Sequence, residues 1–134
     1  MKEYNILYTS GVFDLLHIGH LRFLEKAKSM CNVLIVGIIT DELAESYKRK
    51  PIIPYSQRCH LIRALKCVDI VWSEDKQFTM PYFFAVDKFV IGSDWESCLV
   101  NENLNKLRDE NKVIFIPYTW NISTTDIKKR IKDE

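Results

Sequence analysis

The decapeptide Gly11-Val12-Phe13-Asp14-Leu15-Leu16-His17-Ile18-Gly19-His20 lies directly after a β-prone run at 5–10 and directly before a helix-like run at 21–30. A strand, a glycine turn and a helix start in that order leave backbone N–H groups unpaired at the positive end of the helix dipole, where anions bind. The glycines at 11 and 19 allow a phosphate to approach the backbone closely. The stretch therefore predicts a phosphate site after the first strand of an α/β fold.

Two histidines in this stretch indicate chemistry at the phosphate. His17 and His20 stand three residues apart, about one helical turn, so both rings can donate hydrogen bonds to one phosphate group. Such donors stabilise negative charge that grows on a phosphate in a transition state. A lone histidine is more often an ordinary core or surface residue, but two at this spacing, framed by glycines, favour a functional pair.

Alternating β-prone and helical segments predict the rest of the fold. Strands are expected at 5–10, 32–39, 69–72, 88–91 and 112–116, and helices at 21–30, 56–66 and 101–110. This alternation is typical of an α/β protein with a mostly parallel, five-stranded sheet flanked by helices. Open sheets of this kind bind ligands beyond the carboxyl ends of their strands, which is where the histidine loop begins.

Length, charge and cysteine content limit the class of protein. A chain of 134 residues, 47% of them hydrophobic, can bury a real core, so one domain over 1–134 is expected. Its 19 basic and 18 acidic residues provide no global field for nucleic acid or an anionic membrane. The longest apolar run, 33–39, is too short to span a bilayer, which predicts no membrane insertion. The four cysteines form no C-x-x-C pair and no secretion signal is recognised, so a reduced, cytoplasmic protein is expected.

A basic cluster, Lys48-Arg49-Lys50, follows the second predicted strand and precedes Pro51. Such a cluster is commonly a solvated loop. Here, however, it belongs to the same end of the sheet as the histidines, and a triphosphate needs cationic neighbours. We therefore expect this loop to contribute a phosphate-binding cation.

The pattern G-x-F-D-x-x-H-x-G-H of residues 11–20 resembles the signature of the cytidylyltransferase family, part of the nucleotidyltransferase superfamily. Two further strings match in order. FVIGSDWE, residues 89–96, is similar to a family glycine turn that presents an aspartate and a tryptophan, although Ser93 and Ser97 depart from the pattern. ISTT-x-IK, residues 122–128, is intact, although Tyr118 stands where the family often has arginine. The resemblance implies a single Rossmann-like nucleotide-binding domain.

The resemblance also implies a reaction and a set of site residues. CTP and a phosphorylated alcohol, with glycerol 3-phosphate expected first, would give a CDP-alcohol and pyrophosphate by direct in-line attack, with Mg²⁺ accompanying the CTP. The catalytic residues would be His17, His20 and Lys48, with Lys50 as the alternative to Lys48. The nucleotide would be bound by Gly11, Phe13, Asp14, Gly19, Arg58, Gly92, Asp94, Thr119, Ile122, Ser123 and Thr124. Arg63 and Trp95 would bind the acceptor, and Asp14 is also the expected metal ligand.

Alternatives remain open at this stage. The acceptor could be phosphocholine or phosphoethanolamine, because Ser93 and Ser97 weaken the glycerol 3-phosphate match. The nucleotide could be ATP, as in adenylyltransferases of the same superfamily. A nucleotide-binding sensor without turnover is a third possibility, given Tyr118. The family resemblance further suggests a homodimer, and the aromatic stretch 80–84 is expected either in the core or at the interface.

Overall fold

The computed structural model describes residues 2–117 and 123–133. Its strands form one parallel sheet in the order β3-β2-β1-β4-β5, which confirms the predicted α/β class. The strands are β1 (Tyr4–Gly11), β2 (Cys31–Ile39), β3 (Ile70–Glu74), β4 (Lys88–Gly92) and β5 (Val113–Ile116). The helices are α1 (Ile18–Ser29), α2 (Asp41–Glu45), α3 (Tyr55–Arg63), the 3₁₀ turn η1 (Ser93–Trp95), α4 (Glu102–Asp109) and α5 (Thr124–Lys132).

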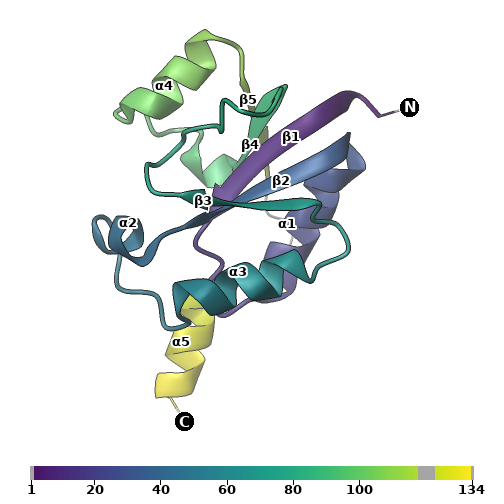
Figure 1. The fold of residues 1–134 in the computed structure, drawn as a ribbon. Helices are drawn as coiled ribbons and strands as arrows, with labels where there is room; N and C mark the ends of the chain where they lie inside the picture. The colour runs from purple at the N-terminus through teal and green to yellow at the C-terminus, as the bar shows by residue number, and fades with distance from the viewer. Residues whose placement is uncertain (1, 118–122, 134) are drawn as a thin grey trace.

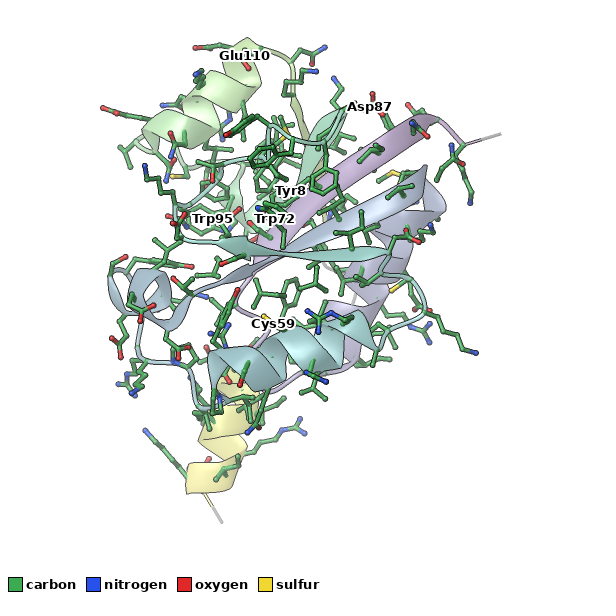
Figure 2. All side chains as sticks on the ribbon, in the orientation of Figure 1. Tyr8, Cys59, Trp72, Asp87, Trp95 and Glu110 are labelled. Atoms are coloured by element: carbon green, nitrogen blue, oxygen red, sulfur yellow. The ribbon has the colours of Figure 1, made fainter. Side chains whose placement is uncertain are left out.

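Helices cover both faces of the sheet (Figure 1). On one face, α1 and α3 pack their apolar side chains against β1 and β2, and Leu24, Leu34 and Ile62 are fully buried there. On the other face, α4 packs through Leu104 and Leu107. Figure 2 shows Tyr8 and Trp95 on the α4 side of the sheet and Cys59 on the α3 side. The apolar runs of β1, β2 and β4 are therefore covered on both faces, as expected of central parallel strands.

A hydrogen bond between buried side chains spans three neighbouring strands on the face of the sheet that α4 covers. The Tyr8 hydroxyl donates a 2.8 Å hydrogen bond to Glu74 Oε1, over the backbone of Gly37 on the strand between them. A Cβ atom at Gly37 would lie 1.9 Å from the Tyr8 hydroxyl, so this crossing requires glycine. Burial raises the pKa of Glu74 to about 7, and within the described part of the chain its Oε2 has no hydrogen-bond partner.

The strand order brings the two glycine turns of the sequence together. β1 and β4 are direct neighbours, and Thr9 Oγ1 donates a 2.7 Å hydrogen bond to the Val90 carbonyl. Gly11 and Gly92 consequently end adjacent strands at the carboxyl end of the sheet. α2 and α5 also lie toward this end (Figure 1). The fold thus gathers residues far apart in the sequence around one edge, as expected for an open parallel sheet.

Candidate functional site

The loop between β1 and α1 has a strained backbone. Phe13 and Leu15 have φ angles of 52° and 51°, in the left-handed region that non-glycine residues seldom adopt. Each such residue costs on the order of 1–3 kcal/mol, and surrounding packing has to hold it in place. The Phe13 ring is buried and meets the His20 ring edge-on, with centroids 5.4 Å apart. A Cβ atom at Gly11 would lie 2.9 Å from the Phe13 ring, so glycine is needed for this close approach.

The two histidines begin α1 and cap it reciprocally. His17 Nδ1 accepts a 3.0 Å hydrogen bond from the Gly19 backbone N–H, and His20 Nδ1 accepts one of 3.2 Å from the His17 backbone N–H. Because both Nδ1 atoms accept, each neutral ring carries its proton on Nε2. The rings stack with centroids 3.8 Å apart. Helix capping thus holds the two rings stacked, each with an Nε2–H group as donor.

The environment keeps both rings uncharged near neutral pH. Burial, reinforced by the neighbouring His17 ring and by the positive charge of Lys48, lowers the pKa of His20 to about 3. Burial also lowers the pKa of His17. In the neutral form each ring accepts its capping hydrogen bond at Nδ1 and keeps one donor, the Nε2–H, for a ligand. Lys48 of the basic loop lines the same cavity as His20.

Asp14 connects the histidine loop to two other segments. Its carboxylate oxygens accept 2.8 Å hydrogen bonds from the backbone N–H groups of Ile52 and Ile53, and Lys128 Nζ lies 3.8 Å from Oδ2. Its backbone carbonyl accepts a 2.7 Å hydrogen bond from Thr124 Oγ1, which anchors the start of α5. Asp14 therefore positions both the basic loop and α5.

The expected role of Asp14 as a metal ligand receives no support from its surroundings. Over residues 2–117 and 123–133, no group of three His, Cys, Asp or Glu side chains could hold a metal ion. The Asp14 carboxylate is moreover already used by two backbone donors. The described residues would therefore hold a Mg²⁺ ion with at most one or two carboxylates, such as Asp14, beside oxygens of a bound triphosphate.

The structure places Arg58 away from the expected nucleotide contact. Its side chain is fully buried and donates hydrogen bonds to the carbonyls of Ile53, Val12 and Ile39, at 2.9, 2.7 and 2.9 Å. Its remaining nitrogen pairs with Asp41 at 2.5 Å. All three guanidinium nitrogens donate to protein partners because the loops after β1 and β2 wrap around the side chain. Arg58 is a structural residue here, and the sequence-based assignment is corrected.

A cavity of about 660 Å³ lies at the carboxyl end of the sheet. It brings together nine of the residues expected in the site: Gly11, Phe13, Asp14, His20, Lys48, Gly92, Asp94, Trp95 and Thr124. His17 and Gly19 are not among the lining residues, although the His17 ring stacks on that of His20, which is. Ser123 caps α5 by accepting a 3.1 Å hydrogen bond from the Asp126 N–H. Arg63 is exposed on α3 and is not part of the lining, which does not support its assignment to the acceptor. Tyr118, Thr119 and Ile122 lie outside the described residues.

The cavity is also lined by residues that were not among the expected site residues. One wall is aromatic: the Phe78 ring meets Trp95 and Phe89 edge-on, at 4.9 and 6.0 Å between centroids. Phe78 has a φ of 56° and sits in a loop without periodicity, so no local signal indicates it. The remaining additions to the lining are Ser10, Val12, Phe23, Ile39, Tyr47, Arg49, Pro51, Gln77, Ile91, Thr125, Lys128, Lys129 and Lys132. The cavity thus has an aromatic wall and a cationic wall.

A parallel sheet with a strained glycine loop, capped histidines and a cationic wall at its carboxyl end defines a nucleotide-binding α/β protein that acts on phosphate. A sequence model of the family described as "Cytidylyltransferase-like" matches residues 8–130, and the chain belongs to this family. The described part of the chain has no helix with the length and apolar character to cross a membrane.

Curated relatives and solved structures agree with this membership. The glycerol-3-phosphate cytidylyltransferase of Bacillus subtilis (strain 168) is 37% identical over 128 residues, covering 92% of this chain and 94% of the relative. The protein of the same name from Staphylococcus aureus (strain NCTC 8325 / PS 47) is 35% identical over 128 residues, covering 92% of each chain. The lipopolysaccharide core biosynthesis protein of Thermoplasma volcanium GSS1 superposes with a TM-score of 0.69 at 24% identity, covering 86% of this chain and 96% of that one. The last comparison concerns the fold alone.

Proposed function

We propose that this protein transfers the cytidylyl group of CTP to glycerol 3-phosphate, giving CDP-glycerol and pyrophosphate. The observation that carries the proposal is the histidine pair, which capping holds in the Nε2–H form, with His20 lining a cationic cavity and His17 stacked on it. Similarity to glycerol-3-phosphate cytidylyltransferases over more than nine-tenths of the chain supports the choice of both substrates.

The proposed chemistry is one displacement at phosphorus. An oxygen of the acceptor phosphate forms a bond to the α-phosphorus of CTP, and the bond between that phosphorus and the bridging oxygen to the β-phosphate breaks, so pyrophosphate leaves. A phosphate monoester is already anionic at neutral pH, so no general base is needed. Charge builds on the α-phosphate oxygens, and the Nε2–H groups of His17 and His20 would donate to them. Lys48 would neutralise the triphosphate, which is expected to arrive as its Mg²⁺ complex.

Different parts of the cavity would bind the nucleoside, the acceptor and the phosphates. Gly92 ends β4 and Asp94 follows it, and together with Trp95 of the aromatic wall they would line the nucleoside or acceptor end. Thr124 and the start of α5 would approach the phosphates, since the Thr124 hydroxyl reaches Asp14 of the histidine loop. Orientation and electrostatic stabilisation supply the rate enhancement in this scheme.

Pyrophosphate release tests the proposal. The purified protein with Mg²⁺ is given CTP, ATP, UTP or GTP, each with glycerol 3-phosphate, phosphocholine, phosphoethanolamine or a sugar 1-phosphate. Release with CTP and glycerol 3-phosphate supports it. Release with another acceptor favours that acceptor, and release with ATP favours an adenylyltransferase. CTP binding without any release would indicate a sensor.

Substitution of the histidines tests the mechanism. Asparagine at position 17 or 20 retains an oxygen that can accept the capping hydrogen bond but removes the ring N–H. We expect His17→Asn and His20→Asn each to lower kcat by about a hundredfold or more while the unfolding midpoint changes little. Wild-type kcat in either folded variant would contradict the assigned role.

We also propose that the protein is a homodimer in the cytoplasm. Tyr82 and Phe83 are 86% and 69% exposed, so they lie outside the core, and the Phe83 ring neighbours Trp72 on the edge strand β3 at 6.1 Å. An exposed aromatic patch beside an unpaired strand edge is suited to association with a second copy. Sedimentation of Phe83→Ser as a monomer, against a dimeric wild type, supports this interface. A monomeric wild type would contradict it. The cysteines are all free, as expected in a reducing compartment.

A further inference from the structure

A row of side chains along α5 faces the cavity. Thr125, Lys128, Lys129 and Lys132 follow the spacing i, i+3, i+4, i+7, which is one stripe of a helix, and all four line the cavity. The stripe rises about 10 Å along the helix axis. None of the nine residues of α5, all of them described, is buried. These four side chains therefore line the cavity, are accessible to solvent and are not part of the hydrophobic core.

The charge of the cavity is strongly one-sided. Five cations line it, Lys48 and Arg49 from the loop after α2 and Lys128, Lys129 and Lys132 from α5, against only two carboxylates. One of these, Asp14, already accepts two backbone hydrogen bonds. The chain as a whole carries a net charge of only +1, so the excess is local. Like charges around one cavity repel each other unless an anion is bound between them.

The position of α5 gives the row a direction relative to the histidines. Thr124 and Lys128 both reach Asp14, at 2.7 and 3.8 Å, and Asp14 belongs to the loop that carries His17 and His20. The row therefore starts beside the proposed α-phosphate position and runs away from it. Over the described residues, no ion pair engages Lys129 or Lys132.

We propose that Lys129 and Lys132 bind the β- and γ-phosphates of the nucleotide, and the pyrophosphate product, opposite Lys48 and Arg49. This inference rests on the proposed function, in which the α-phosphate lies at the histidines. The phosphates beyond it carry most of the substrate's charge, and the lysine row is the cationic wall that continues in that direction. Ammonium groups donate charge-assisted hydrogen bonds to phosphate oxygens. The row thereby distinguishes a nucleoside triphosphate from a monophosphate.

The test measures affinities by calorimetry with three probes: inorganic pyrophosphate, CTP and CMP. Lys129→Gln and Lys132→Gln are compared with Arg130→Gln, which removes one positive charge from the same helix at an exposed position outside the cavity lining. We expect each lysine variant to weaken pyrophosphate and CTP binding about tenfold, with CMP binding unchanged. Arg130→Gln is expected to leave all three affinities near those of the wild type.

Two outcomes overturn the inference. Unchanged pyrophosphate affinity in both lysine variants is one, and an equal loss in Arg130→Gln, which would indicate only a general field, is the other. The proposed function fails separately. If the wild type releases no pyrophosphate with any nucleotide, the function is wrong, whereas the pyrophosphate affinities still decide whether the lysine row is a polyphosphate site.

Discussion

Arg58 offers the sharpest test of the structure, because the family resemblance implies a nucleotide contact for it and its surroundings indicate a structural role. Arg58→Met removes the guanidinium while keeping a long, unbranched side chain. The change deletes three hydrogen bonds to backbone carbonyls and the ion pair with Asp41. It leaves the carbonyls of Val12, Ile39 and Ile53 without this donor at the base of the site.

The size of the effect follows from burial. Removing one partner of a buried ion pair costs about 3–5 kcal/mol, because the other groups stay desolvated. Arg58 is completely buried, but the Asp41 side chain is 30% exposed and can regain water. We therefore expect the lower end, a loss of about 3 kcal/mol in the free energy of unfolding. For a domain of this size that lowers Tm by about 10 °C.

Urea unfolding of the wild type, Arg58→Met and Arg63→Met measures the difference. Arg63 is an exposed residue at the end of the same helix, so its substitution is expected to change stability by no more than about 0.5 kcal/mol. CTP affinity is measured in parallel, at a temperature where all three proteins are folded. An Arg58→Met variant with wild-type stability and lost CTP affinity would refute the reasoning and restore the nucleotide contact.

Three further changes test the packing around the site. Gly37→Ala places a methyl group 1.9 Å from the Tyr8 hydroxyl and should reduce the free energy of unfolding by about 2–3 kcal/mol, whereas a loss below about 0.5 kcal/mol would contradict this close approach. The pKa of Glu74 is about 7 in the folded protein against an ordinary 4.5, so between these pH values the folded state keeps a proton that the unfolded state has released. The free energy of unfolding therefore falls as pH rises from 4.5 through about 7. The glutamine in Glu74→Gln does not titrate. The free energy of unfolding of this variant should therefore gain up to about 3 kcal/mol relative to the wild type between pH 5 and 8, and urea-measured profiles of the two proteins that stay parallel over this range would refute the reasoning. Gly11→Ala pushes the Phe13 ring away from its 2.9 Å approach and is expected to lower kcat for pyrophosphate release at least tenfold in a folded protein, whereas an unchanged kcat would show that the loop tolerates a Cβ.

The sequence by itself determined the order of the five strands and of α1, α3 and α4, and the centre of the site. Apolar runs of strand length alternate with amphipathic helical segments, and that periodicity is local information. Gly11 marks the turn after β1, and the spacing of His17 and His20 places two rings on the first turn of α1. Ser123 lies three residues before Asp126 and accepts its backbone N–H, so the cap of α5 is likewise made by near neighbours in the sequence. These features depend on neighbours a few residues away, so the sequence carries them.

Only the tertiary structure decided which of the candidate residues meet. The family resemblance places Arg58 in the nucleotide site, yet three segments fold over its guanidinium and bury it. Phe78 and Lys132 carry no motif, yet they line the same cavity from a loop and from the last helix. Burial, pKa and the sign of the local charge depend on distances between segments far apart in the chain. Those distances are set by how the helices pack on the sheet, because packing optimises the whole core at once and no short stretch of sequence specifies it.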